Sequence, residues 1–460
     1  KHWSSLATWI GWLIVTHHKL PQMGFENFSS ANKPELRLAV LRNIQRTMGY
    51  IKQAGEPKWK FNKGLPLLSE AWCKDAARWA KKAQELLPRV PEVESSERLL
   101  LTLARLALML GDHNYSSADA DNNWKTDLEL NANTDRKTGK PKQKLDEHLV
   151  HVANAALEIS HFLPRFETEL PKVDELRALR KPAKGMFAWQ NLAVQALAEW
   201  RKEHDLAKQG FFAINMASTG YGKTFANAKV MGALQTDNSL RFNLALGLRT
   251  LTLQTGDEYR EKLHLDKTQL AVLIGSAAVR FLHEQGKTAP TDVAQVEKLE
   301  SESGSASEQD LTADLELIYD TAIPETRFST ILKTPRSRQL LYAPVVVSTI
   351  DHLMPATEST AGGKHILPIL RLMSADLVID EVDDFDQSDM PAIARLVHLV
   401  GMLGRKLMIS SATIPPAVAE GLFQAYQAGW TLFANSRKRQ ADVTAFWLDE
   451  FGAQVNLMSD

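Results

Sequence analysis

The sequence predicts an α + α/β protein, with an all-helical region followed by a region built on a doubly wound parallel sheet. Over residues 1–166, apolar side chains recur at the three-to-four spacing of amphipathic helices, with no alternating strand pattern. From Gly185 onward, short apolar runs alternate with longer helical stretches. That alternation is typical of parallel strands joined by helical crossovers.

The composition fits an ordinary globular protein and excludes several classes. The 460 residues are 44% hydrophobic and carry 54 basic and 55 acidic side chains, a net charge of -1. This balance excludes a uniformly basic nucleic-acid coat but not a local basic groove. The single cysteine, Cys73, excludes an intrachain disulfide and indicates a reducing compartment such as the cytoplasm. We expect no membrane association, because the longest apolar region, Leu99–Leu110, is interrupted and too short to cross a bilayer.

Within the first region, the spacing predicts helices over Glu35–Met48, Glu70–Leu87, Arg98–Leu110 and Asp146–Phe162. The polar stretch between the last two, residues 116–144, is predicted to be a mobile insertion. We expect residues 1–166 to form one domain and residues 167–184, which lack sustained periodicity, to form a linker.

Residues 185–460 are expected to form the second domain. Its strands are predicted over residues 211–217, 242–253, 344–349, 375–379 and 406–410. Residues 284–312 are rich in Glu, Ser and Gln with little apolar content, which predicts a flexible insertion.

The most specific motif is Ala-Ser-Thr-Gly-Tyr-Gly-Lys-Thr at residues 217–224, between a predicted strand and a predicted helix. That context is typical of a phosphate loop for ATP with Mg²⁺. The glycines let backbone N–H groups face phosphate oxygens, Lys223 reaches the β and γ phosphates, and Thr224 binds the cation. A strand-to-helix turn with a chance Lys-Thr pair is the alternative. The predicted nucleotide-binding residues here are Ser218, Thr219, Gly220, Tyr221, Gly222, Lys223 and Thr224.

A second motif supplies the acidic partner of that loop. Asp380 and Glu381 directly follow the apolar run 377–379. We expect Asp380 to bind Mg²⁺, mostly through water, and Glu381 to orient and deprotonate the water that attacks the γ-phosphate. The predicted catalytic residues are therefore Lys223, Asp380 and Glu381. The alternative is a merely solvated acidic loop, and Asp383 and Asp384 have no assigned role.

Two weaker motifs fit the same chemistry. Ser411-Ala412-Thr413 follows the last predicted strand and matches the element that couples nucleotide state to strand movement in superfamily 2 helicases. We therefore assign a coupling role to Ser411 and Thr413. Gln190 lies about thirty residues before the phosphate loop, where such helicases place a glutamine that binds adenine. A surface helix glutamine is the alternative for Gln190.

Hydroxyl groups gather where two further predicted strands end. Thr250 and Thr255 follow the run that starts at Phe242, and Thr349 ends the run 344–349. Such positions are expected at the sheet edge, where Thr250, Thr255 and Thr349 would bind DNA phosphates with a cation from Arg249. Each of them is as well explained as a helix cap or a turn former.

Histidines and one carboxylate follow two apolar helical runs of the first region. His17 and His18 are adjacent, so on a helix they point about 100° apart and suit two ions better than one. Together with Asp112 they are a donor set for transition-metal ions that activate water. A surface or capping role is the alternative for the His-His pair. His148 and His151 could share a helix face, and we expect them to be structural.

The combination resembles one family, the CRISPR-associated helicase-nucleases of type I interference systems. Residues 12–21 and 110–117, together with the Asp-Glu-Val-Asp box at 380–383, look most like the subtype I-F branch, which is fused to an adaptation-type domain. The resemblance implies an HD-type nuclease region that ends near residue 166, followed by the first RecA-like helicase lobe. It also implies two divalent transition-metal ions bound by His17, His18 and Asp112.

The implied activity is ATP-driven translocation along single-stranded DNA, with the nuclease cutting the strand delivered to it. The implied partners are an RNA-guided surveillance complex, the adaptation integrase and phage-encoded inhibitor proteins, all in the bacterial cytoplasm.

Two departures from the family pattern accompany the resemblance. The family's His-Asp pair and earlier histidines have no match before His17, and too few residues follow Thr413 for a second helicase lobe. We therefore expect an internal fragment that by itself binds ATP weakly and hydrolyses it slowly. Two other classes stay open: a superfamily 2 ATPase with an accessory helical region, and a module whose helical half docks a protein partner.

Overall fold

The computed structural model describes residues 2–17, 64–86, 97–135, 138–174, 176–235, 239–247, 249–273, 319, 328–358 and 362–459. The chain divides into two compact units. Unit 1 comprises residues 1–168, 323–331 and 358–366, and unit 2 comprises residues 169–322, 332–357 and 367–460. The predicted insertion 284–312 and the predicted helix Glu35–Met48 lie outside the described residues.

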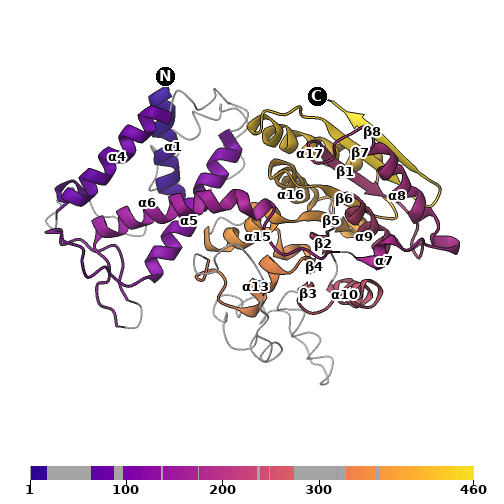
Figure 1. Ribbon diagram of the computed structural model, residues 1–460, viewed down its shortest axis with the longest axis horizontal. Coiled ribbons are helices and arrows are strands. Elements are labelled where there is room, and N and C mark those ends of the chain that lie inside the picture. Colours follow the sequence, from indigo (N-terminus) through magenta and orange to yellow (C-terminus); the bar gives the residue numbers. More distant parts are fainter. Residues whose placement is uncertain are drawn as a thin grey trace. The chain divides into compact units, whose positions relative to one another are not determined.

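Unit 1 is helical (Figure 1). Within its described residues, the elements are α1 (His2–Thr16), η2 (Pro66–Leu68), α4 (Glu70–Leu86), α5 (Glu97–Ser117), α6 (Leu145–Phe162) and η4 (Leu163–Glu167). Helices α4, α5 and α6 form where the apolar spacing predicts them, although α5 extends seven residues beyond Leu110. No helix among the described residues of either unit is long and apolar enough to span a membrane.

Two close contacts fix how the helices of unit 1 pack. Helices α5 and α6 approach each other at Gly111, where an added Cβ would lie 2.7 Å from the backbone nitrogen of Ala156. Helix α1 is joined to α5 by the buried guanidinium of Arg105, whose Nε donates to the carbonyl oxygen of Thr16 at 2.9 Å. Both contacts lie close to the predicted histidine and aspartate motifs.

The polar stretch before α6 is tied down along its described part. The fully buried Gln143 donates from Nε2 to the carbonyl oxygens of Tyr115 and Ala118, at 2.7 and 2.9 Å. The indole of Trp124 donates to Asp146 at the start of α6, at 3.0 Å. These bonds attach the stretch to both helices, contrary to the prediction of a mobile insertion.

The described residues of unit 2 form one sheet of eight strands in the order β3-β4-β2-β5-β6-β1-β7-β8, and every neighbouring pair is parallel except β7 and β8. The predicted α/β class with a mainly parallel sheet is confirmed. The strands are β1 (Gly210–Asn215), β2 (Phe242–Leu246), β3 (Leu270–Leu273), β4 (Val345–Thr349), β5 (Asp376–Asp380), β6 (Leu407–Ser410), β7 (Val443–Leu448) and β8 (Ala453–Met458).

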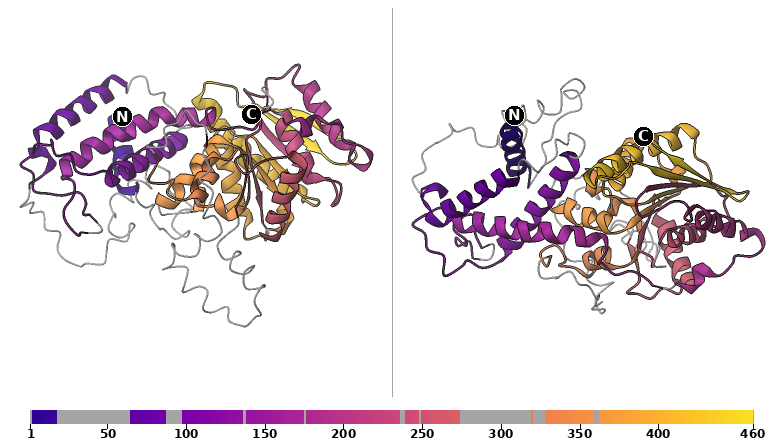
Figure 2. Two further views of the ribbon diagram at one scale, coloured as in Figure 1. Left: turned by 60° about the horizontal axis from the view of Figure 1, so that its bottom comes forward. Right: turned by 45° about the horizontal axis from the view of Figure 1, so that its top comes forward.

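The connecting helices cover both faces of this sheet (Figure 2). Phe211 of β1 belongs to the buried cluster shared with α8 (Trp189–Trp200), α9 (Lys223–Ala233) and α10 (Arg249–Leu263). The next residue, Phe212, packs on the opposite face against Phe423 and Tyr426 of α17 (Pro416–Ser436). The other helices of unit 2 are α7 (Arg177–Arg180), α13 (Pro335–Tyr342), α14 (Pro355–Glu358), α16 (Met390–Met402), most of α15 (Gly362–Ser374) and the 3-10 turns η5 (Gly185–Phe187), η8 (Ile350–His352) and η9 (Val382–Asp384).

Two further predicted segments differ from the expectation. The predicted strand 242–253 ends at Leu246, and its remaining residues include the first turns of α10. The sequence does not reveal this boundary, because the strand and then the helix bury consecutive parts of one apolar run. In the predicted linker, Leu170 and Val173 are buried, and Val173 exchanges backbone hydrogen bonds with Leu240. This part of the segment packs within unit 2.

Candidate functional site

The predicted nucleotide motifs converge at one edge of the sheet. The phosphate loop follows β1, the Asp-Glu pair ends β5, and Ser411 follows β6, which lies between them. The register aligns Ser410 of β6 with both Asn215 of β1 and Asp380 of β5. Because parallel strands end at the same edge, three motifs far apart in sequence become neighbours, and this is the edge where open α/β sheets bind ligands.

The phosphate loop has the backbone that its sequence predicts. Gly220 and Gly222 have φ angles of 86° and 79°, in the left-handed region that glycine adopts without strain. Gly222 is the N-cap residue of α9, so the N–H groups at the end of the loop lie at a helix N-terminus. Ser218, Thr219 and Gly220 are exposed. The loop therefore has the conformation and access that an anion requires.

The start of α8 supports this loop from behind. Trp189 donates from Nε1 to the carbonyl oxygen of Tyr221 at 3.1 Å, and Gln190 donates from Nε2 to that of Gly222 at 3.2 Å. Gln190 is buried, and its Oε1 has no hydrogen-bond partner. This oxygen could accept a hydrogen bond from an amino group such as that of adenine.

Lys223 and the acidic pair face each other across the edge. The ammonium of Lys223, only 6% exposed, lies 3.8 Å from Oε1 of Glu381 and has no hydrogen-bond partner. A buried ammonium without a hydrogen bond is costly, so its environment favours a bound anion. Together with Thr224 and Asp380, these groups fit ATP with Mg²⁺.

The two carboxyls are tuned by burial. Burial raises the pKa of Asp380 above its usual range, against the opposing effects of the nearby Ser410 hydroxyl and the charge of Lys223. Burial and then the charge of Asp380 raise the pKa of Glu381. Glu381 also has a φ of 54°, an unusual value for a non-glycine residue and one typical of functional sites. A carboxyl with a raised pKa is a better proton acceptor once it is ionised.

Asp383, which the sequence left without a role, joins the acidic box to the Ser-Ala-Thr segment. Its carboxylate accepts hydrogen bonds from the hydroxyls of Ser411 at 2.6 Å and Thr413 at 2.9 Å. Burial alone would raise the pKa of Asp383, but these two bonds bring it below the usual range. The contact joins Ser411 and Thr413 to the acidic box at the edge of the sheet. In the sequence, only the order of the two motifs along the chain indicated this contact.

Glu450, in the turn between β7 and β8, is a further residue that sequence reasoning missed. Its carboxylate accepts hydrogen bonds from the N–H and the hydroxyl of Ser218. The hydrogen bond from the Ser218 hydroxyl is the largest cause of a lowered pKa for Glu450. The contact closes the amino-terminal side of the loop, and no motif around Glu450 signals it.

Of the residues predicted to bind DNA, some lie in a helix and not at the end of a strand. Arg249, Thr250 and Thr255 lie in α10, so their predicted position is wrong for the reason given above. Thr255 is buried, and Thr349, which does end β4, is fully buried. The hydroxyls of Thr255 and Thr349 are therefore not presented on an open surface. Their contact with DNA stays a prediction.

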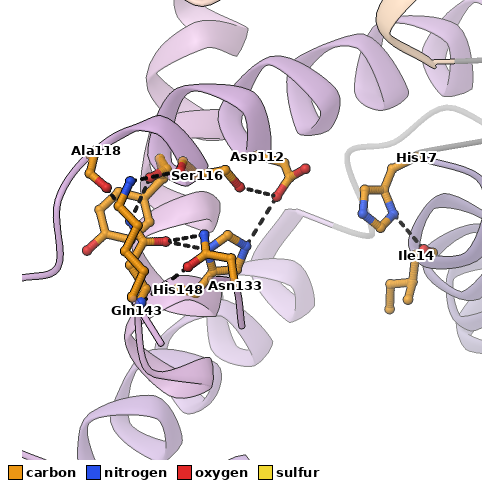
Figure 3. Close-up of polar contacts among 10 residues, drawn as sticks. Ile14, His17, Asp112, Ser116, Ala118, Asn133, Gln143 and His148 are labelled. Atoms are coloured by element: carbon orange, nitrogen blue, oxygen red, sulfur yellow. Dashed lines mark hydrogen bonds and ion pairs between the residues drawn. The ribbon is translucent and has the colours of Figure 1, made fainter. Parts of the chain in front are cut away.

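The histidine and aspartate motifs of unit 1 come from two packed helices (Figure 3). Asp112 lies seven residues after Arg105 on α5, so the two share a helix face, and Arg105 binds the carbonyl of Thr16 at the end of α1. His17 directly follows Thr16, and its Nδ1 contacts the carbonyl oxygen of Ile14 at 2.6 Å. A proton on Nδ1 leaves Nε2 unprotonated, the state in which a histidine nitrogen is able to bind a metal.

The metal prediction is only partly covered by the described residues. An imidazole and a carboxylate are chemically suited to a transition-metal ion, and His17 and Asp112 supply them. His18 lies outside the described residues. Within the described ranges, no group of three His, Cys, Asp or Glu side chains could hold a metal ion. The chemistry of this donor pair therefore fits a metal, and the full ligand set stays a prediction.

Fold and motifs define the class first: unit 2 is a phosphate-loop α/β fold with a mainly parallel sheet. No protein-family model matches the chain. The chain is 42% identical, over 99% of its length, to a protein of Pectobacterium atrosepticum named CRISPR-associated nuclease/helicase Cas3 subtype I-F/YPEST. It is 40% identical, over 98% of its length, to the protein of that name from Pseudomonas aeruginosa. The chain is therefore a relative of the subtype I-F Cas3 proteins, and the resemblance predicted from its motifs is confirmed.

The chain spans 43% and 41% of the length of these two relatives. Among solved structures, the crystal structure of T. fusca Cas3-ATP aligns with 94% of this chain and 38% of its own, at 17% identity and a TM-score of 0.42.

Proposed function

We propose that this chain provides the ATP-hydrolysing lobe and part of the nuclease of a CRISPR-associated helicase that moves along single-stranded DNA and degrades it. The names of the two relatives, nuclease/helicase Cas3, support both activities. The observation that carries the proposal is the buried ammonium of Lys223, which lies 3.8 Å from Glu381 beneath an exposed phosphate loop and has no hydrogen-bond partner.

Each residue at the sheet edge has a distinct task in this proposal. Lys223 and the loop amides bind the β and γ phosphates and stabilise the charge that develops on them. Glu381 orients the attacking water and accepts its proton. Mg²⁺, held by Thr224 and Asp380, would neutralise phosphate charge. Gln190 would bind the adenine edge, and the contacts of Asp383 with Ser411 and Thr413 would transmit the state of the nucleotide to β6.

The ATP site is tested by Lys223→Ala in the intact helicase-nuclease, with Lys202→Ala as the control. Lys202 is exposed and pairs with Glu199 at the surface. We expect Lys223→Ala to reduce DNA-stimulated ATP hydrolysis by about 100-fold or more, the scale of losing one buried charge-stabilising group. Lys202→Ala should leave it unchanged. Wild-type hydrolysis in Lys223→Ala would refute the proposed site.

We further propose that unit 1 belongs to the HD-type nuclease, with His17, His18 and Asp112 among its metal ligands. Bound transition-metal ions would activate water for phosphodiester cleavage. The supporting observations are the Nδ1 contact of His17 and the attachment of its helix end to the Asp112-bearing face of α5. Asp112→Ala should abolish metal-dependent cutting of single-stranded DNA, and Asp119→Ala, in the exposed stretch after α5, should not. Persistent cutting by Asp112→Ala would favour an accessory role for the helices.

The remaining parts of the proposal concern partners and location. We propose recruitment by an RNA-guided type I surveillance complex in the bacterial cytoplasm, since both relatives are named as CRISPR-associated proteins of subtype I-F. Contacts with the adaptation integrase and with phage-encoded inhibitors are proposed only on the family resemblance. A pull-down with the purified surveillance complex, before and after R-loop formation, tests the first of these partners.

A further inference from the structure

A carboxylate that the proposed ATP mechanism does not use lies at the start of the phosphate loop. Glu450, in the turn 449–452 between β7 and β8, accepts hydrogen bonds from the N–H of Ser218 at 3.0 Å and from the Ser218 hydroxyl. We propose that Glu450 is an internal anion that takes the place of nucleotide phosphate at Ser218, and that ATP displaces it on binding. This inference rests on the ATP function proposed above.

The sheet holds Glu450 beside the loop. Strand β7 pairs with β1 in parallel, so the turn after β7 and the loop after β1 leave the same edge (Figure 1). The N–H of Met216 donates to the carbonyl oxygen of Leu448 at 2.8 Å and joins the two segments there. Within the turn, Oδ1 of Asp449 accepts from the N–H groups of residues 451 and 452, at 2.8 and 3.0 Å. Glu450 therefore lies on a short turn with hydrogen bonds of its own.

Glu450 is ionised and lies within the electrostatic reach of Lys223. The hydrogen bond from the Ser218 hydroxyl is the largest cause of the lowered pKa of Glu450, and the charge of Lys223 also lowers that pKa. Glu381 lies 3.8 Å from the same ammonium. Two carboxylates of the chain itself therefore balance the charge of Lys223, which is the task of the phosphates in the proposed complex with ATP.

Glu450 and a phosphate cannot use Ser218 at the same time. The single N–H and the single hydroxyl proton of Ser218 are both donated to the carboxylate. Phosphate oxygens also only accept, so a phosphate at this end of the loop needs the same donors. Two negative charges about 4 Å apart in water repel by an amount that corresponds to about fivefold in a binding constant. Bound ATP should therefore break both bonds and release the turn 449–452.

The test is the binding of a fluorescent, non-hydrolysable ATP analogue with Mg²⁺ to the intact helicase-nuclease, at low and at high salt. Glu450→Gln keeps an acceptor oxygen but removes the charge, and Glu450→Ala removes both. Glu203→Gln is the matched control, because Glu203 is exposed beyond the end of α8 that lies away from the phosphate loop. Lys223→Ala tests the ATP site itself. Thermal melting establishes that each variant is folded.

Hydrogen exchange gives a second measurement, on the wild-type protein. Saturating analogue should speed exchange in the peptide that contains the turn 449–452, and in Glu450→Ala that peptide should exchange rapidly with or without the analogue. Unchanged or slower exchange in the wild type would mean that the bonds to Ser218 persist when nucleotide binds, and would overturn the inference.

We expect Glu450→Gln and Glu450→Ala each to bind the analogue about 3- to 10-fold more tightly than wild type at low salt, the scale of one charge contact. Glu203→Gln should match wild type. The gain should shrink at about 1 M salt, where the Debye length is about 3 Å, and an undiminished gain there would contradict competition between charges.

Unchanged or weaker binding by either folded Glu450 variant would overturn the inference, because Glu450 would then support the loop and not compete with the nucleotide. If Lys223→Ala loses the analogue in that case, the ATP site stands and only the role of Glu450 fails. If Lys223→Ala binds the analogue as wild type does, the proposed ATP site fails, and the inference fails with it.

Discussion

The two candidate sites of this chain are built in opposite ways. The nucleotide site lies along one edge of a parallel sheet, and its motifs follow individual strands, so each is contiguous in sequence. The helical site draws on His17 and Asp112 from separate segments, and the bonds around it come from the guanidinium of Arg105, from amides and from backbone carbonyls. A site at the strand ends can be read from short motifs, whereas a site between helices depends on packing that no short motif encodes.

The largest expected effect follows from replacing Glu381, the proposed general base of the nucleotide site. Glu381→Gln keeps the size of the side chain but cannot accept a proton, so ATP hydrolysis should fall by about 10²- to 10⁴-fold. Binding of a fluorescent ATP analogue should persist because the phosphate loop is intact. Asp386→Asn, on an exposed residue shortly after the acidic box, is the control. Full hydrolysis by Glu381→Gln would remove Glu381 from the mechanism.

A second variant tests whether the helical site depends on packing. In Gly111→Ala the new carbon would lie 2.7 Å from the backbone of Ala156, which cannot move as a side chain would. We expect unit 1 to lose about 1–3 kcal/mol of stability, the usual effect of overpacking. Hydrogen exchange should become faster in α5 and α6 and stay unchanged in β1 and β5.

Gly421→Ala is the matched control for that variant. Gly421 lies in α17, where an added Cβ meets nothing within 4 Å, so alanine should leave stability equal or slightly higher. Equal exchange rates in Gly111→Ala and wild type would mean that the close α5–α6 contact is unimportant.

A third test concerns the bond between two strand ends. Asp383 accepts from both Ser411 and Thr413, so Asp383→Asn and Ser411→Ala should each impair unwinding more than ATP hydrolysis. Residues in direct contact typically show coupling energies of about 0.5–3 kcal/mol. We therefore expect the double variant to be impaired less than the sum of the single variants, measured as rates of DNA unwinding. Additive effects would separate the acidic box from the Ser-Ala-Thr segment.

The smallest expected effect is a pH-dependent shift in stability. Burial raises the pKa of Asp380 above its unfolded-state value, so the metal-free folded protein binds this proton more tightly than the unfolded chain. Stability conferred by this group therefore falls as pH rises between the two pKa values, and the full penalty is present above both.

Asp380→Asn removes that penalty. In chelator-treated protein without nucleotide, its melting temperature should exceed that of wild type by about 2 °C at pH 7, since each kcal/mol shifts a unit of this size by a few degrees. The difference should vanish at a pH below both pKa values. A lower melting temperature for Asp380→Asn at pH 7 would contradict the direction of the shift.

Much of the α/β unit could be predicted from the sequence, because buried parallel strands appear as apolar runs and the motifs follow them directly. Strands β3, β7 and β8 were missed, β3 because its four residues are too short a run to stand out. Strand β7 is buried through its pairing with β1, which the sequence does not show. Strand β8 is largely exposed at the sheet edge, so the sequence of β8 has no apolar run. The position of Thr250 and Thr255 was missed because one apolar run spans a strand, a turn and the start of a helix.

The helical site was harder to predict because the tasks of its residues depend on distant partners. The contact between His148 and Asp112 depends on Gln143, an ordinary polar residue in a stretch that the sequence predicts as a loop, and Gln143 is held by backbone carbonyls of Tyr115 and Ala118. The carboxylate of Glu450 likewise accepts a hydrogen bond from Ser218, which lies 232 residues earlier in the chain. Such contacts become visible only once packing has fixed which backbone carbonyls lie nearby.

The central claim is that this chain carries two separate sites, one for ATP in unit 2 and one for a nuclease metal in unit 1. The most direct measurement compares Lys223→Ala and Asp112→Ala in the intact helicase-nuclease for ATP-dependent unwinding and for metal-dependent cutting of single-stranded DNA. We expect Lys223→Ala to lose unwinding and keep cutting, and Asp112→Ala to lose cutting and keep ATP hydrolysis. Equal loss of both activities in either variant would contradict two separable sites.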